Sequence, residues 1–126
     1  MGYCSDVSVL FYTRNIDALP FGTLKFWFDE NYPRKDATEY WGAEIETGHH
    51  WVMVTYKDVK WYEDFDHVKA VRACLDSFVE CLEGDIDSPN AAYEMVEVGE
   101  QVDDIRETRS DYCDYLLGVR REIVME

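Results

Sequence analysis

The segment 65–83 constrains the fold of this chain more than any other part of the sequence. Its apolar residues recur at spacings of three and four, the period of one face of an α-helix. These residues are Val68, Val71, Leu75, Phe78 and Leu82. Asp64 or Asp66 can cap the start of the helix, and Gly84 stands just past its end. A helix with one apolar face must bury that face, so the rest of the chain has to supply a partner layer.

Short runs rich in β-branched and aromatic residues supply that layer as strands. The predicted strands span residues 3–12, 40–47, 50–57, 92–98 and 115–125. Gly48-His49 predicts a hairpin connection between the second and third of these runs. The acidic stretch 100–111 is predicted to form a loop or a short helix.

The region that follows the first predicted strand allows two interpretations. Residues 15–20 contain Asn, Asp and Pro, which are typical of a helix start, and Leu24 and Phe28 then follow at helical spacing. The competing interpretation is a strand, because Leu24, Phe26 and Phe28 also alternate along the chain. We favour the helix. Residues 31–33 (Asn-Tyr-Pro) end the element in either case, because the residue before a proline disfavours helical backbone.

The order of these elements predicts one α+β domain over residues 1–126. A length of 126 residues is typical of a single domain, and the chain contains no repeat or Gly/Ser linker that would divide it. The order strand, helix, strand, strand, helix, strand is that of the ferredoxin-like βαββαβ arrangement. We therefore expect an antiparallel sheet with two helices on one face, plus an extra strand.

Acidic residues dominate the charge of the chain. The net charge is −15, from 27 acids and 12 bases. Such a chain repels phosphate backbones and anionic lipid headgroups, so direct binding to nucleic acid or to a membrane surface is disfavoured. The excess is uneven: residues 1–57 carry a net −3 and residues 58–126 a net −12. The sequence therefore favours a partner with a basic surface.

The stretch 73–105 contains ten acids and no Lys or Arg. The acids are Asp76, Glu80, Glu83, Asp85, Asp87, Glu94, Glu97, Glu100, Asp103 and Asp104. One interpretation is a solvated face that keeps the protein soluble. A second is a docking surface whose carboxylates imitate the phosphates of a nucleic acid and occupy a basic groove. A third is a divalent-cation site at Asp85-Ile86-Asp87 and Asp103-Asp104, although no EF-hand spacing is present.

Aromatic residues gather at the entry to the predicted helix. Trp61, Tyr62 and Phe65 lie within six residues of the chain. Packing of the helix start against the core is one interpretation. The other is that exposed Trp61 and Tyr62, beside acids, anchor an interface. We include both residues with the ten acids in the predicted partner-binding site.

No pattern in the sequence predicts catalysis or a bound cofactor. Known nucleophile, phosphate-loop and zinc motifs are absent, and the adjacent His49 and His50 would point to opposite faces of a strand. We therefore expect no catalytic residue, no metal and no cofactor. The four cysteines lack the CxxC spacing of a zinc ribbon or thioredoxin-like motif, and Cys74 and Cys81 are about two turns apart on the predicted helix, too far for a disulfide. We therefore expect reduced cysteines in a cytosolic protein. We also expect no signal peptide and no membrane span.

The N-terminal residues Met1-Gly2-Tyr3-Cys4-Ser5-Asp6-Val7 carry a resemblance to a known group of proteins. The segments Val59-Lys60-Trp61-Tyr62 and Tyr93 to Glu100, the latter followed by Asp103-Asp104-Ile105, add to it. Together they resemble small, largely uncharacterised proteins of bacteriophages and prophages, whose N-termini read Met-Gly-Tyr-x-Ser-Asp/Glu-Val. The resemblance implies a phage origin and the cytoplasm of a bacterial host. It implies no activity and no catalytic residues.

From charge and resemblance together, we predict a phage-encoded, non-enzymatic inhibitor that binds a host protein. An anti-CRISPR or other anti-defence protein that blocks a nucleic-acid-binding groove would fit this description. One alternative is a phage structural or assembly module that forms oligomers through aromatic contacts. Another is a small metal-binding regulator or enzyme. We expect the chain itself to be a monomer or a dimer.

Overall fold

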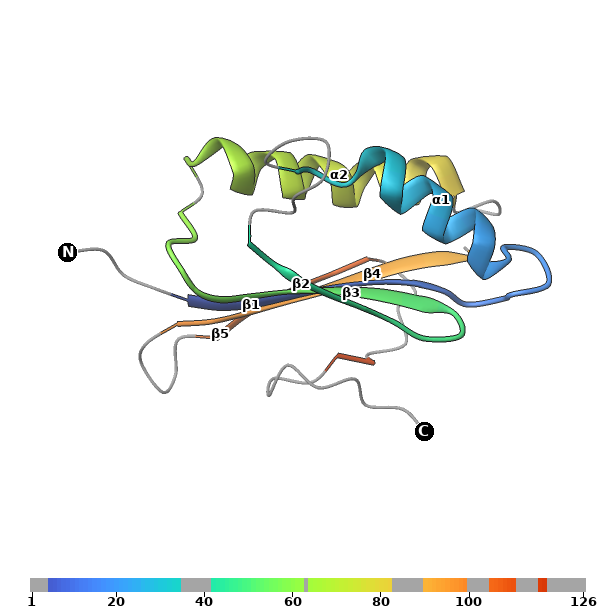
Figure 1. Ribbon diagram of the computed structural model, residues 1–126, viewed down its shortest axis with the longest axis horizontal. Coiled ribbons are helices and arrows are strands. Elements are labelled where there is room, and N and C mark those ends of the chain that lie inside the picture. Colours follow the sequence, from blue (N-terminus) through green and yellow to red (C-terminus); the bar gives the residue numbers. More distant parts are fainter. Residues whose placement is uncertain are drawn as a thin grey trace.

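The computed structural model describes residues 5–34, 42–62, 64–82, 90–99, 105–110 and 116–117 (Figure 1). These residues form two helices and five strands. In chain order the elements are β1 (Ser5–Thr13), α1 (Phe21–Asn31), β2 (Glu44–Thr47), β3 (Trp51–Val59), α2 (Asp66–Leu82), β4 (Ala91–Val98) and β5 (Ile105–Arg109). The first six elements follow the predicted order, and β5 comes after them.

The strands form one antiparallel sheet in the order β2-β3-β1-β4-β5. Strand β1 lies at its centre and pairs with β3 on one side and β4 on the other. Figure 1 shows α1 and α2 on the same face of this sheet. The predicted α+β class, with an antiparallel sheet and two helices on one face, is therefore confirmed.

The larger core fills the space between the sheet and the helices. Phe11 stands at its centre, with its ring centroid 4.9 Å from that of Phe78 on α2 and 5.6 Å from that of Phe28 on α1. Helix α2 turns Val68, Val71, Leu75 and Phe78 into this core. This is the face that the spacing of three and four predicts.

Helix α1 confirms the helical interpretation of residues 21–28 over the strand interpretation. A strand would place Leu24, Phe26 and Phe28 on one face. Instead, Leu24 and Phe28 are buried with Trp27, and Phe26 is 69% exposed. The helix begins after Pro20 and ends at Asn31, two residues before Pro33, as predicted.

Strand β5 corrects the prediction of a loop or short helix over residues 100–111. Residues 105–109 pair with β4 in antiparallel register, which places Arg106 opposite Glu97 and Arg109 opposite Glu94. The sequence of β5, IRETR, has weak strand propensity. The neighbouring strand and the two opposite-charge pairs supply what local propensity does not.

A smaller core lies on the face of the sheet opposite the helices. Leu10 and Tyr12 of β1 and Val96 of β4 are buried there together with Leu117. Figure 1 shows the short segment at residues 116–117 beneath this face. The prediction of a strand over residues 115–125 otherwise lies outside the described residues.

Candidate functional site

The structure places the four described acids of the predicted docking surface in three different environments. Asp76 and Glu80 are exposed on α2. Glu97 lies on the helix side of β4 and is nearly buried, and Glu94 is fully buried on the opposite face of the same strand. The remaining predicted acids lie outside the described residues: Glu83, Asp85, Asp87, Glu100, Asp103 and Asp104. The described acids of this stretch therefore do not converge on one surface.

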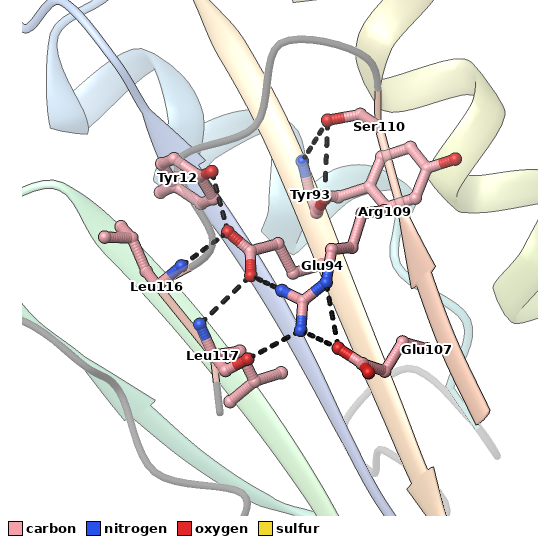
Figure 2. Close-up of polar contacts among 8 residues, drawn as sticks. All are labelled: Tyr12, Tyr93, Glu94, Glu107, Arg109, Ser110, Leu116 and Leu117. Atoms are coloured by element: carbon pink, nitrogen blue, oxygen red, sulfur yellow. Dashed lines mark hydrogen bonds and ion pairs between the residues drawn. The ribbon is translucent and has the colours of Figure 1, made fainter. Parts of the chain in front are cut away.

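Glu94 is the centre of a buried polar network on the face opposite the helices (Figure 2). The Tyr12 hydroxyl and the Leu116 backbone N–H each donate to Oε2 of Glu94 at 2.8 Å. The Leu117 N–H donates to Oε1 at 3.0 Å, and the Arg109 guanidinium forms an ion pair with the same oxygen. Four donors from three separate parts of the chain meet this one carboxylate.

Arg109 extends the network from Glu94 to two further groups. Its Nη2 donates to the Leu117 carbonyl oxygen at 2.9 Å, and its Nε donates to Oε1 of Glu107 at 3.2 Å. Just beyond Arg109, the Ser110 N–H donates to the Tyr93 carbonyl oxygen at 3.1 Å, and the Tyr93 N–H donates to Ser110 Oγ at 3.0 Å. The end of β5 and the segment 116–117 are thus fixed to β4 by hydrogen bonds (Figure 2).

The geometry of Glu94 suits a structural role better than a chemical one. A carboxylate offers about four acceptor positions, and four donors already occupy those of Glu94. Little acceptor capacity is left for a metal ion or for a proton taken from a substrate. A buried charge of this kind is tolerated because it is paired and hydrogen-bonded.

Glu97 is also engaged within the fold. Its Oε2 accepts a hydrogen bond from the Arg72 guanidinium of α2 at 3.2 Å. This ion pair joins α2 to β4 at the side of the larger core. Glu94 and Glu97 are therefore both compensated by arginines of the same chain, and their charges contribute little to an external surface.

Trp61 and Tyr62 pack at the entry to α2. Trp61 is 7% exposed, and its ring centroid lies 5.1 Å from that of Tyr56 and 5.7 Å from that of His67. Tyr62 is half-buried, with its ring edge-on to Phe65. Among the described neighbours, Trp61 Nε1 has no hydrogen-bond partner. The geometry is that of core packing at a helix start, which the sequence also allowed.

A groove of about 370 Å³ lies between the two helices. Its walls are Trp27, Asn31 and Pro33 on the side of α1 and Ala70, Ala73, Cys74 and Ser77 on α2. Burial raises the pKa of the Cys74 thiol to about 12. The thiol is protonated at neutral pH and is a poor nucleophile, because the thiolate is the reactive form.

The described titratable groups do not assemble into a recognisable reactive centre. His67 contacts the rings of Trp61 and Phe65, and partial burial lowers its pKa. The Tyr32 and Tyr56 hydroxyls share a hydrogen bond of 2.8 Å inside the larger core, where burial raises both pKa values. Within the described ranges, no three His, Cys, Asp or Glu side chains are placed to hold a metal ion.

Sequence reasoning did not identify the pairing of Glu94 with Tyr12 and Arg109. One signal was present: the alternation along β4 places Glu94 in a row with Ala92, Val96 and Val98. A lone acid in an apolar row predicts a buried and compensated charge. Its partners could not be identified, because they depend on the register of β4 with β1 and β5.

Comparisons with protein-family models, curated proteins and solved structures give no match to this chain. Neither helix in the described part of the chain is both long enough and apolar enough to cross a membrane.

Proposed function

We propose that this protein is a non-enzymatic inhibitor of phage origin that binds a basic surface of a host protein. The target surface is one that normally holds nucleic acid, as in the defence complexes that include CRISPR effectors. Carboxylates of the inhibitor occupy the positions of phosphates. The phage origin and the bacterial cytoplasm as its place of action rest on the resemblance of the N-terminal motif.

One observation carries the proposal: the fold uses several of its few cations internally and leaves acids of α2 exposed. Lys25 is held by Asp29 at 2.7 Å, Arg72 by Glu97, and Arg109 by Glu94. Asp76 and Glu80 are exposed on α2 and form no ion pair with any described residue. Asp76 and Glu80 therefore add negative charge to the exposed side of α2, in the sense of the net charge of −15.

Electrostatic attraction of this kind accelerates association and weakens with salt. The test is capture of binding partners from bacterial lysate by the full chain at low and high ionic strength, followed by elution with duplex DNA. We expect a specific partner that is retained at low salt and is released by salt and by DNA. A partner whose retention is insensitive to both would contradict the proposal.

A further inference from the structure

The groove between α1 and α2 is lined by residues that take no part in the Glu94 network or in the ion pairs described above. The two helices lie on one face of the sheet (Figure 1), and side chains from both line the groove. Small side chains, among them Ala73 and Ser77, line the wall of the groove on α2, and Trp27 lines the opposite wall. The helices therefore approach without filling the space between them.

The size and lining of the groove suit apolar side chains of a partner. Its volume of about 370 Å³ is near the lower end of the roughly 300–1,000 Å³ that is typical of ligand pockets. Ala73 and Ser77 are exposed. Phe26, on the outer side of α1, is the most exposed large apolar residue among those described, at 69%. The outer surface of the helix layer thus presents both an apolar recess and an apolar projection.

Acids border this groove on both helices. Glu30 is exposed three residues after Trp27, which lines the groove, and so lies beside the wall of the groove on α1. On α2, Asp76 and Glu80 are exposed three residues after Ala73 and Ser77, respectively, and so lie beside the wall of the groove. Lys69 is the only exposed cation of α1 and α2 within the described residues. An apolar recess with acidic borders is complementary to an apolar side chain that has cations on either side of it.

We propose that the α1–α2 groove binds a Lys/Arg-rich amphipathic helix of the partner protein. Apolar residues of that helix enter the groove, and its cations lie along Glu30 on one side and Asp76 and Glu80 on the other. This is the helix-in-groove mode of recognition, with charge selecting the partner. The proposal rests on the proposed function and names the surface and the kind of partner.

The test uses a fluorescein-labelled synthetic helix of Leu and Lys as the probe, with binding to the full chain measured by fluorescence anisotropy. The groove is filled by Ala73→Trp, and its border is reversed by Asp76→Lys with Glu80→Lys. Glu44→Lys with Glu46→Lys on β2 is the matched control, because both acids are exposed and the net charge again changes from −15 to −11. Circular dichroism checks that each variant is folded.

We expect Ala73→Trp and the α2 reversal each to weaken binding of the Leu/Lys probe about tenfold, and the β2 reversal less than about threefold. A helix of Ala and Lys with the same charge should bind the wild type more weakly than the Leu/Lys probe. If both charge reversals weakened binding equally and Ala73→Trp had no effect, the groove would not be the binding site. Binding through the net negative charge of the protein would still stand. Failure of the wild type to bind the probe at low salt would overturn both the groove and the electrostatic basis of the proposed function.

Discussion

The two faces of the sheet are held by different forces. On the helix side, Phe11 and its aromatic neighbours form an extensive core. Glu97, the one charged side chain that is buried on this side among the described residues, lies beside this core and is paired with Arg72. On the opposite face the core is small, and the fully buried Glu94 lies within it. Apolar burial dominates the first face, and a compensated charge with its hydrogen bonds organises the second.

The difference shows how a small apolar surface can still fix a chain segment in one position. Burial of Leu117 supplies only a few kcal/mol, because the hydrophobic gain for one side chain is about 1.5–3 kcal/mol. The Glu94 carboxylate fixes the position of this segment, since it accepts hydrogen bonds from the backbone N–H groups of both Leu116 and Leu117. Hydrogen bonds to a charged group are stronger than neutral ones and are specific for geometry.

The largest expected effect comes from the centre of the helix-side core. Phe11→Ala should lower the free energy of unfolding by about 4 kcal/mol, because a large buried ring leaves a cavity. The ring of Phe11 meets those of Trp27, Phe28, Tyr32 and Phe78. Urea denaturation measures the change. Phe26→Ala is the control, since Phe26 is exposed and should change stability by only about 0.5 kcal/mol. Equal effects of the two changes would contradict the assigned core.

The next effect tests the opposite face. Glu94→Gln should lower the free energy of unfolding by about 3 kcal/mol, because it leaves Arg109 without its buried counter-charge. Glu97→Gln on the same strand is the control and should cost about 1 kcal/mol, because its ion pair with Arg72 is partly exposed. Both are measured by urea denaturation.

A double variant separates the ion pair from the rest of the Glu94 network. Glu94→Gln with Arg109→Met should recover part of the loss, because no buried guanidinium is then left without the Glu94 carboxylate. If Glu94→Gln were no more harmful than Glu97→Gln, the second face would not depend on a buried charge.

High pH should weaken the helix-side core. Burial raises the pKa of Cys74 from 9.0 to about 12, so the folded state keeps a proton that the unfolded state releases. The stabilisation is complete below about pH 9 and is lost as the pH rises toward 12. Burial raises the pKa values of Tyr32 and Tyr56 as well, so these groups act in the same direction.

Cys74→Ala isolates the part of this dependence that belongs to the thiol. Between neutral pH and about pH 10.5, the free energy of unfolding should fall by about 2 kcal/mol more in the wild type than in Cys74→Ala. Urea denaturation at a series of pH values, followed by circular dichroism, measures the difference. Parallel curves of stability against pH for the two proteins would show that burial does not raise the pKa of the Cys74 thiol.

The smallest effect concerns the hairpin between β2 and β3. A Cβ atom at Gly48 would meet the indole of Trp51, which packs against the smaller core. Gly48→Ala should therefore lower the melting temperature, with a loss of about 1 kcal/mol. Gly22→Ala on α1 is the control: its Cβ meets open space, and the change should be neutral or slightly stabilising. A thermal melt in which the two variants behave alike would show that Trp51 is free to move.

Periodic segments of this protein could be predicted because their pattern repeats over many residues. The spacing from Val68 to Phe78 fixes both the helical state of α2 and the face it buries. Strand β5 could not be predicted, because Arg106 and Arg109 form a strand only where Glu97 and Glu94 stand opposite them. Local propensity is a weak guide when a neighbouring strand supplies the stabilisation.

The same distinction applies to the residues of the predicted partner-binding site. Exposure of Asp76 and Glu80 follows from their place on the polar side of a helix whose apolar side is evident. For Glu94, Glu97 and Trp61, the sequence predicts a strand or a helix entry but does not decide whether the side chain meets solvent or a partner within the fold. That depends on contacts with residues far away in the chain.

The sequence by itself determined the α+β class, helix α2, the central strands and the strongly negative charge, because composition and periodicity are properties of the chain. Only the tertiary structure decided which acids remain at the surface. Burial of a charge depends on whether compensating donors reach it, and those of Glu94 come from β1, β5 and the segment 116–117. Strand register and packing decide which donors come into contact with Glu94, and neither can be determined from local sequence alone.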